Sequence, residues 1–379
     1  DELEVDIDPQ AVVSQLSTGY RQLTEITAAL SQEARILIFD EPTASLTQTE
    51  TLSLFRLMRR LKDKGISMIY ISHRMEEIFK IADRITVLRD GRRIITDEIS
   101  NLTIQKVIEH ILGRKAEAID SRELVSTVQQ DQVLLDVKNL KCNRGVNDIS
   151  FRLHRGEVIG LAGLMGSGRT ELMQAIFGIN PIKEGDILVK GKSIKVKTPE
   201  ESMKSDIALI PEDRRVQGLI LDHSIRDNFI LPMIQLKRLA NRNIFVDYRR
   251  GNDLAEHYVK TLKIRSDSIE KMVRFLSGGN QQKVVIAKWL STEPEILLMD
   301  EPTAGVDIGT KSEILNIVRD LAKQGKGVIF ISSELQELIA VCDRVIVIKN
   351  GQVDQVLNRH DIPGEERLHQ ILQGASNSG

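Results

Sequence analysis

One sequence pattern occurs twice in this chain, and it constrains the fold more than any other feature. Residues 16–47 and residues 276–307 align without a gap, 260 positions apart. The match continues over about 75 residues, as far as the turns at Gly91 and Gly351. Ungapped similarity of this length is typical of a duplicated structural unit. The sequence therefore predicts the tail of one domain followed by the whole of a second.

Each copy contains an apolar strand that ends in two adjacent carboxylates. In the second copy residues 295–299 lead into Asp300 and Glu301, and in the first copy the equivalent pair is Asp40 and Glu41. Acids are common at solvated strand ends, but recurrence at a fixed spacing argues against that interpretation. The carboxyl ends of buried parallel strands are where open α/β folds place their ligands. One carboxylate of each pair can hold Mg²⁺ and the other can polarise a water molecule.

Composition narrows the class of protein. The 379 residues suit two or three domains, and 41% of them are hydrophobic, which is enough for packed cores. The net charge of −2 shows no basic excess, so nucleic acid is not expected as the main partner. The two cysteines, Cys142 and Cys342, lack metal-ligand spacing and fit a reduced cytosolic setting. No apolar run approaches the roughly 18 residues that a membrane span needs.

The domain boundaries follow from the repeat and from a polar stretch. We expect residues 1–112 to be the C-terminal part of the first domain, residues 113–131 a linker and residues 132–379 the second domain. The chain starts with Asp1, and this start is interpreted as a truncation. In the first domain the pattern predicts helices and strands, with a type I′ hairpin at Asp90-Gly91. The helices are expected at 17–31, 48–63 and 103–112, and the strands at 34–40, 67–72, 84–88 and 93–96.

The second domain should be an α/β structure with a helical insertion. Strands are expected at 133–138, 147–153, 157–163 and 206–211, with edge strands over 186–198 and a helix after residue 169. From residue 225 to about 270 the pattern is mostly helical, with breaks at the Leu-Pro-Met and Arg-Gly-Asn triplets that begin at 231 and 250. This insertion is predicted to form a separate helical subdomain.

A glycine-rich loop at residues 163–170 is the candidate phosphate-binding site. It matches the pattern G-x-x-x-x-G-[K]-[ST], except that arginine replaces lysine. Glycines let backbone N–H groups curl around a phosphate, and the following helix N-terminus adds positive charge. The alternative is a plain glycine turn between a strand and a helix, which the acidic pair in the same domain disfavours. The candidate residues are Gly163, Gly166, Ser167, Gly168, Arg169 and Thr170, with Thr170 also a candidate magnesium ligand.

A serine-glycine turn precedes the repeated helix in each copy. Residues 276–279 read Leu-Ser-Gly-Gly, and their counterparts, residues 16–19, keep the serine but lose one glycine. A serine here can simply cap the helix. It can also present its hydroxyl and N–H groups to a γ-phosphate across an interface, and the sequence does not separate the two roles. The candidates are Ser277, Gly278 and Gly279 in the second copy, and Ser17 and Gly19 in the first.

The two copies differ where hydrolysis would be carried out. His73 ends a strand of the first copy, and its counterpart in the second copy is Ser333. An isolated histidine is more often structural than catalytic. A hydroxyl cannot replace an imidazole that hydrogen-bonds a γ-phosphate and an attacking water. We therefore expect unequal catalytic ability in the two copies.

At this point the motifs resemble a known family. The segments LSGGNQQ, LLMDEPTAGVD and GSGRT, together with the repeat, are similar to the ATP-binding subunit of an ABC transporter. PEDRR and ISSE at residues 211–215 and 331–334 resemble the sugar-import class in which two ATPase domains are fused. The resemblance covers nearly the whole chain. It implies a P-loop NTPase ABC-ATPase fold, α/β with a mixed sheet core and a helical subdomain, as a tandem repeat whose first copy is incomplete.

The resemblance also implies two ATP–Mg²⁺ sites, each shared between domains. In one, the loop 163–170, Asp300 and Glu301 would face residues 16–19. In the other, Asp40, Glu41 and His73 of the first copy would face residues 277–279 of the second copy. That second site has the better catalytic set, whereas Arg169 and Ser333 make the first site degenerate. The implied catalytic residues are Glu41, His73 and Glu301, and the implied metal ligands are Thr170, Asp300 and Asp40.

Three departures from the family pattern stand out. Glu212 replaces the usual glutamine of the loop that touches the membrane partner, and Thr47 replaces the aspartate that its counterpart supplies at Asp307. No aromatic residue precedes strand 147–153 to stack on adenine. We expect ATP binding with weak turnover in this chain.

The implied partners are membrane permease subunits, a periplasmic sugar-binding protein acting indirectly, and a second copy of the subunit in a homodimer. The implied location is the cytoplasmic face of the bacterial inner membrane, as a peripheral protein. A soluble ABC ATPase acting in translation or DNA repair is the alternative. Those proteins usually carry basic or coiled-coil insertions and keep lysine in both phosphate loops, and the stretch 113–131 has no such insertion.

Overall fold

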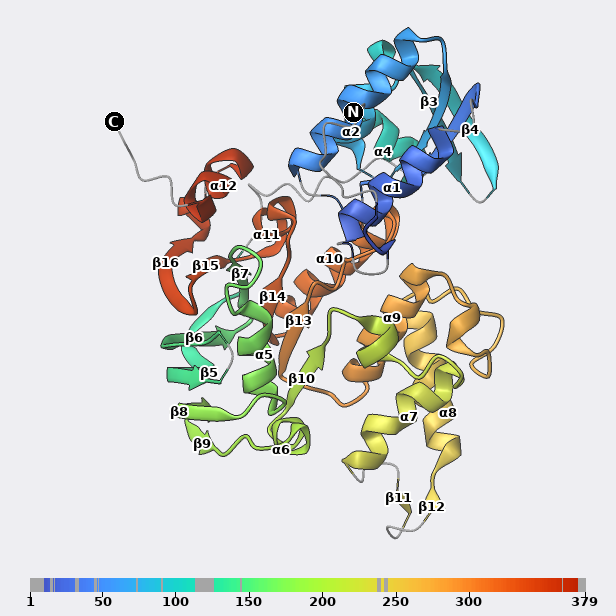
Figure 1. The fold of residues 1–379 in the computed structure, drawn as a ribbon. Coiled ribbons are helices and arrows are strands. Elements are labelled where there is room, and N and C mark those ends of the chain that lie inside the picture. Colours follow the sequence, from blue (N-terminus) through green and yellow to red (C-terminus); the bar gives the residue numbers. More distant parts are fainter. Residues whose placement is uncertain are drawn as a thin grey trace. The chain divides into compact units, whose positions relative to one another are not determined.

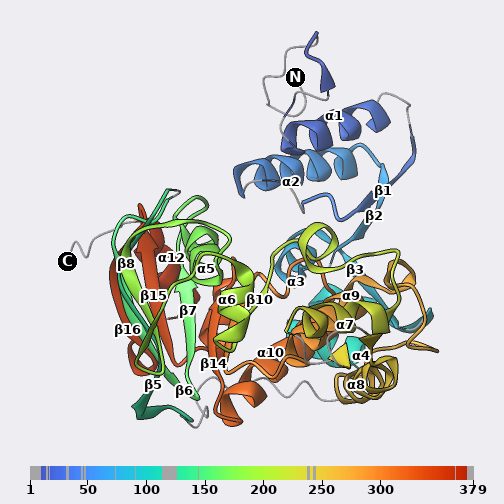
Figure 2. The same ribbon diagram turned by 90° about the horizontal axis from the view of Figure 1, so that it is seen from below.

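The computed structural model describes most of the chain and divides it into two compact units, Asp1–Glu117 and Ala118–Gly379. Figures 1 and 2 show the elements of each unit. The described residues are 10–13, 16, 18–30, 34–43, 46, 48–72, 74–89, 91–112, 126–143, 145–236, 240–241, 245–362 and 364–373. Among them, no helix combines the length and the apolar character that crossing a bilayer requires.

The first unit contains a parallel strand pair, a hairpin and helices. Strands β1 and β2 pair in parallel, and β3 and β4 pair antiparallel. The elements are α1 (Thr18–Leu30), β1 (Ile36–Asp40), α2 (Gln48–Asp63), β2 (Ser67–Ile71), α3 (Met75–Ile81), β3 (Arg84–Arg89), β4 (Arg92–Glu98) and α4 (Ile104–Leu112). The bounds of the expected elements agree with the prediction to within two residues, whereas helix α3 was not expected. Asp90, which the predicted type I′ turn requires, lies outside the described residues.

The second unit is built on a six-stranded mixed sheet. Its order is β10-β13-β14-β7-β15-β16, with all pairs parallel except β15–β16. The strands are β7 (Val158–Ala162), β10 (Ile207–Ile210), β13 (Ile296–Asp300), β14 (Gly327–Ile331), β15 (Arg344–Lys349) and β16 (Gln352–Asn358). Every residue of β7, β13 and β14 is buried, which explains why their sequences are continuous apolar runs rather than alternating ones.

Each face of this sheet has its own hydrophobic core. One face packs with α9 (Gly278–Leu290), α10 (Ile308–Lys323), α11 (Leu335–Val341) and α12 (Glu365–Gln373). The other face packs with α5 (Arg169–Phe177), α6 (Pro199–Lys204) and a second, antiparallel sheet. That sheet has the order β6-β5-β8-β9 and comprises β5 (Gln129–Cys142), β6 (Ile149–Arg155), β8 (Ile182–Val189) and β9 (Lys192–Ile194). Strand β5 begins within the stretch 113–131 expected as a linker.

The helical insertion is present, but its two expected breaks are wrong. Helix α7 (Ile225–Gln235) contains Pro232, and helix α8 (Tyr248–Thr261) runs through Gly251. A Cβ on Gly251 would lie 2.7 Å from Cδ1 of Ile230, so glycine there allows α8 to approach α7 closely. Tertiary packing thus overrides the helix-breaking preference of these residues.

The duplication is visible element by element. Helices α1 to α3 and strands β1 to β4 have counterparts α9 to α11 and β13 to β16, each displaced by 260 positions. Burial differs between the copies. Ile36, Ile38, Ile69 and Ile71 of the first sheet are about half or more exposed. Their counterparts in β13 and β14 are buried beneath α5 and the antiparallel sheet.

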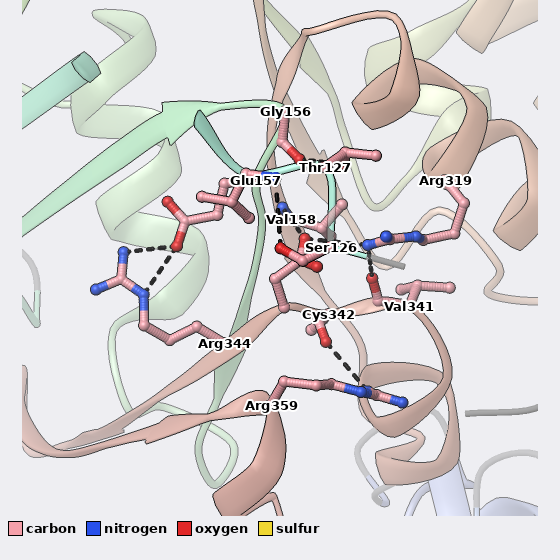
Figure 3. A network of polar contacts seen from close by, with 12 residues as sticks. Ser126, Thr127, Gly156, Glu157, Val158, Arg319, Val341, Cys342, Arg344 and Arg359 are labelled. Carbon is pink, nitrogen blue, oxygen red and sulfur yellow. Dashed lines mark hydrogen bonds and ion pairs between the residues drawn. The ribbon is translucent and has the colours of Figure 1, made fainter. Parts of the chain in front are cut away.

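A network of polar contacts lies at the N-terminal end of β7 (Figure 3). Asp343 accepts a hydrogen bond from the backbone N–H of Val158 at 2.8 Å and pairs with Arg319 at 3.0 Å. Arg344 pairs with Glu157 at 2.9 Å, and the Thr127 hydroxyl donates to the Gly156 carbonyl at 2.7 Å. These buried charges are paired, as burial requires. The network joins the segment before β5 to β7, α10 and β15 at the N-terminal ends of β7 and β15.

Adding a methyl group at Gly160 in β7 should destabilise the second unit. A Cβ there would lie 2.7 Å from Sγ of Cys342 and 3.1 Å from Cδ2 of Leu338. Overpacking of this kind costs about 1–3 kcal/mol. Urea unfolding of Gly160→Ala should show a loss in that range. Gly364→Ala is the matched control, because nothing lies within 4 Å of its added carbon, and it should stay within about 0.5 kcal/mol. Equal losses in both variants would contradict this account.

Candidate functional site

The glycine loop between β7 and α5 has the backbone geometry of a cradle. Gly166 and Gly168 have φ angles of +78° and +102°, which other residues rarely adopt. A Cβ on Gly163 would lie 2.4 Å from the Ser167 hydroxyl and 2.6 Å from the Ile348 carbonyl. The loop therefore requires glycine at these positions. It leads directly into α5, whose N-cap position is Gly168.

Two neighbouring turns hold this loop in place. The Gly351 N–H, from the β15–β16 turn, donates to the Ser167 carbonyl at 3.0 Å. A Cβ on Gly168 would lie only 2.2 Å from the carbonyl oxygen of Gly145, in the turn between β5 and β6. In the β15–β16 turn, Asn350 and Gly351 both have positive φ angles, 52° and 75°. The second copy of the repeated turn thus supports the phosphate loop.

Asp300 is a buried acid at the end of β13. It is 3% exposed, and its Oδ1 atom has no hydrogen-bond partner. Burial raises the pKa of its carboxyl to about 7, although a hydrogen bond from Thr170 lowers it. The negative charges of Glu212 and Glu301 raise that pKa further, and Arg169 lowers it. An ionised Asp300 therefore lacks a full counter-charge from the protein.

Glu301 lies beside Asp300 in a strained backbone conformation. Its φ of 45° is in the left-handed region, which is uncommon for non-glycine residues. Its N–H donates to the Ile331 carbonyl at 3.1 Å, and its Oε2 accepts from the Ser333 hydroxyl at 3.2 Å. Burial raises the pKa of Glu301, and the Ser333 hydrogen bonds and the Arg169 charge lower it. The structure thus brings Glu301 into contact with Ser333, the counterpart of His73 in the first copy.

Arg169 is drawn towards the same strand end. Its Nη1 donates to the Ser332 carbonyl at 3.5 Å. The guanidinium therefore contributes positive charge near both carboxylates while it contacts β14. The planar guanidinium of arginine directs its N–H groups in a fixed fork, whereas the ammonium group of lysine is a compact point charge.

These features fit a nucleotide phosphate with a divalent cation. The Ser167 hydroxyl, which belongs to the glycine loop, is buried without a partner, and so is Asp300 Oδ1 at the end of β13. Among the described residues, no group of three or more histidine, cysteine or acidic side chains is arranged to hold a metal ion. Mg²⁺ does not need such a group, since it is commonly bound by one or two protein oxygens together with phosphate oxygens. Thr170 and Asp300, whose side chains are close enough for Thr170 to lower the pKa of Asp300, supply oxygens of that kind.

The first unit repeats the acidic pair. Asp40 ends β1, and Glu41 has a φ of 47° and donates its N–H to the Ile71 carbonyl at 2.9 Å. The backbone at Glu41 thus matches that at Glu301. His73 and Ser17 lie outside the described residues, and Gly19 lies in the first turn of α1.

The serine-glycine turn of the second copy, residues 276–279, leads into α9. Ser277 occupies the N-cap position, but its side chain makes no capping hydrogen bond and instead accepts from Asn280 Nδ2 at 2.9 Å. A Cβ on Gly279 would lie 2.5 Å from the Thr310 hydroxyl, so glycine allows α9 to pack closely on α10. Beside Gly278, Arg214 donates to the Ala304 carbonyl at 2.8 Å.

Sequence reasoning missed several side chains that support the acidic pairs. Thr303 and Ser332 both donate to the buried carboxylate of Glu337, at 2.6 and 2.7 Å. In the first unit Thr43 donates to Glu77 at 2.7 Å. The signal was present, since Thr43 and Glu77 are 260 positions from Thr303 and Glu337.

Comparison with known proteins identifies the family. Residues 146–304 match the model of the ABC transporter family. The whole chain is 42% identical to a putative ribose/galactose/methyl galactoside import ATP-binding protein of Agrobacterium fabrum, of which it covers 74%. Across 98% of its length it is 43% identical to a ribose import ATP-binding protein, RbsA, of Geobacillus kaustophilus, again covering 74% of that protein.

A solved structure supports the fold. A nucleotide-free ATP-binding cassette from an ABC transporter matches 64% of this chain and 96% of its own, with a TM-score of 0.53 and 24% identity. The expected α/β ABC-ATPase fold with a mixed sheet is therefore confirmed.

Replacing Asp300 with asparagine should stabilise the nucleotide-free protein in a pH-dependent way. Because the pKa of Asp300 is raised from 3.8 to about 7, the folded state keeps a proton that the unfolded chain loses between these values. Stability therefore falls as the pH rises through this window. Urea unfolding should show Asp300→Asn more stable by on the order of 2–4 kcal/mol near pH 8, with the advantage shrinking towards pH 4.

The exposed Asp354→Asn variant controls for the loss of one negative charge. A difference between Asp300→Asn and the unaltered protein that stays constant with pH would show that Asp300 is not held protonated by burial.

Proposed function

This chain belongs to the ATP-binding proteins of sugar-import ABC transporters, and from that membership we propose that its second unit binds Mg-ATP at loop 163–170. The observation that carries the proposal is the glycine cradle beside an acid whose Oδ1 is buried and unpaired. Proteins of this family hydrolyse ATP to drive sugar import.

The proposed roles of the residues follow from their chemistry. Backbone N–H groups of Gly166 to Thr170 would bind the phosphates, helped by the N-terminus of α5. The Thr170 hydroxyl and the Asp300 carboxylate would hold Mg²⁺, whose charge would stabilise ionised Asp300. Bound Mg-ATP supplies the phosphoanhydride bond whose cleavage releases free energy. Glu301 is proposed to orient the attacking water.

We also propose that each site is completed by the other unit. Loop 163–170 would be complemented by Ser17 and Gly19, and Asp40, Glu41 and His73 by residues 277–279. The repetition of the left-handed glutamate in both units supports equivalent roles for Glu41 and Glu301. In the first unit, Asp40 is the proposed metal ligand, and Glu41 and His73 are the proposed catalytic residues.

The two sites should differ in turnover. Arg169 replaces a lysine in the loop, and Ser333 donates to Glu301 where a histidine would reach a phosphate. Both changes weaken transition-state stabilisation more than nucleotide binding. We therefore propose that the Glu301 site binds ATP tightly but hydrolyses it slowly.

The partners and the location remain part of this proposal. The chain would act as a peripheral subunit on the cytoplasmic face of the bacterial inner membrane. There it would bind permease subunits, as a homodimer, with a periplasmic sugar-binding protein acting indirectly and no nucleic acid. The names of its relatives make ribose or galactose the first sugars to test. The alternative of a soluble ATPase in translation or DNA repair finds no support among these relatives.

Removing the Thr170 hydroxyl should weaken magnesium-dependent binding. We expect Thr170→Ala to lower ATP affinity about tenfold in the presence of Mg²⁺, because one cation ligand is lost, and to change it little in EDTA. Titration calorimetry of the full chain measures both conditions. Thr261→Ala, which removes an exposed hydroxyl on α8, is the control. Equal loss with and without Mg²⁺ would rule out the assigned role.

Turnover by this chain should be slow. With Arg169 and Ser333 in place, we expect a rate below about 1 s⁻¹, the lower end for ordinary enzymes. A coupled phosphate-release assay measures it, with Glu301→Gln as the comparison. Rapid hydrolysis that Glu301→Gln abolishes would show that the Glu301 site is not degenerate.

A further inference from the structure

A buried glutamate lies behind the acidic pair in each unit. Glu337, on α11, is 3% exposed, and Glu77, on α3, is 9% exposed. Neither belongs to a glycine loop, an acidic pair or a signature. Burying a carboxylate costs free energy unless it is paired and hydrogen-bonded. The partners of these two acids therefore indicate their role.

In the second unit, Glu337 joins the ends of two strands. Its Oε2 accepts from Thr303, which lies in the turn after Glu301, and from Ser332, directly after β14. Its Oε1 lies 3.3 Å from Nζ of Lys311, on α10. The carboxylate therefore receives two hydroxyl hydrogen bonds on one oxygen and a cation on the other.

The first unit builds the same arrangement from different residues. Glu77 Oε2 accepts from Thr43 at 2.7 Å and from the Tyr70 hydroxyl at 2.8 Å. Its Oε1 lies 3.1 Å from Nη1 of Arg74. Two hydroxyls and one cation thus surround each carboxylate.

Of these contacts, only the hydrogen bond from the threonine to the glutamate is made by equivalent residues in both copies. The counterpart of Tyr70 is Phe330, which has no hydroxyl, and the counterpart of Arg74 is Glu334. Glu334 itself pairs with Lys311 at 2.5 Å. The second hydroxyl bond comes from Tyr70 in one unit and from Ser332 in the other, although Ser72, the counterpart of Ser332, is also a serine. The cation likewise comes from different positions, while the bond from the threonine is the same in both units. Repetition with compensation indicates that the threonine–glutamate bond is the functional part.

That bond fixes the turn that begins with the left-handed glutamate. Glu41 and Glu301 have φ angles of 47° and 45°, a conformation that persists only when its surroundings enforce it. Each donates its N–H to the end of the neighbouring strand, and the threonine two residues later is tied to the buried acid. The turn is thus held at both ends.

We propose that Glu77 and Glu337 are positioning residues that hold Glu41 and Glu301, through Thr43 and Thr303, in the orientation required for hydrolysis. The catalytic meaning of this inference rests on the proposed function. The restraint itself does not, because it can be measured in the absence of nucleotide.

Hydrogen exchange of the full, nucleotide-free chain tests the restraint. The variants are Thr303→Val, which removes the hydroxyl and keeps the shape, and Thr303→Ser, which keeps the hydroxyl. Losing a hydrogen bond to a charged group should speed exchange of the Glu301 amide about tenfold to a hundredfold in Thr303→Val. In Thr303→Ser the change should stay within about threefold.

The duplication supplies internal controls. Thr303→Val should leave the Glu41 amide unchanged, and Thr43→Val should speed exchange at Glu41 alone. Thr292→Val removes a hydroxyl bond to the Trp289 carbonyl elsewhere in the second unit, and it should not affect Glu301. If Glu337→Gln does not fold, the two Thr303 variants still decide the question.

The outcomes that overturn the proposal are specific. Unchanged exchange at Glu301 in Thr303→Val, a rise shared by all amides of the second unit, or an equal effect of Thr303→Ser would each show that the bond is merely structural. ATP affinity is measured separately on the unaltered chain. Failure to bind ATP would reject the proposed function, and the exchange results would still decide whether Glu337 restrains the turn.

Discussion

The candidate site depends on one unbalanced charge, the carboxylate of Asp300. The parallel sheet places it at a strand end between two hydrophobic cores, where water cannot solvate it. Thr170 and the positive charge of Arg169 lower its pKa, and none of the ion pairs found among the described residues involves Asp300. A buried acid of this kind is costly in the empty protein and favourable once a cation arrives. The same burial that destabilises the site without ligand would therefore favour binding of the proposed Mg-ATP.

The loop that faces Asp300 is constrained by sterics rather than by charge. Gly166 and Gly168 have positive φ angles, and a Cβ on Gly168 or on Gly163 would meet the carbonyl oxygen of Gly145 or of Ile348. Gly145 and Ile348 are far apart in sequence. The phosphate loop thus owes its shape to long-range packing, although its sequence is local. A substitution in a distant hairpin would distort it as surely as one within it.

The two units show which features of an ATPase half are essential. Burial of the sheet faces differs between the copies, and so do the partners of the buried glutamates. The left-handed glutamate and its bond to the neighbouring strand do not differ. The backbone geometry at Glu41 and Glu301, the residues proposed to hold the reacting water, is the same in both units. The side chains that surround the buried glutamates differ.

The sequence by itself determined most of the secondary structure, the duplication and the acidic pairs. These features arise from local periodicity and from a fixed repeat spacing, both of which can be counted along the chain. Residue preferences misled at Pro232 and Gly251, where close packing of α7 and α8 keeps both helices continuous.

Only the tertiary structure decided which side chains support the site. Thr303, Ser332 and Lys311 meet at Glu337 because adjacent parallel strands and two helices converge there. The repeat spacing shows that Thr303 and Glu337 recur together, but only the packing of distant elements shows which side chains are in contact. The raised pKa of Asp300 likewise follows from burial in three dimensions, since the same residue at an exposed strand end would be an ordinary acid.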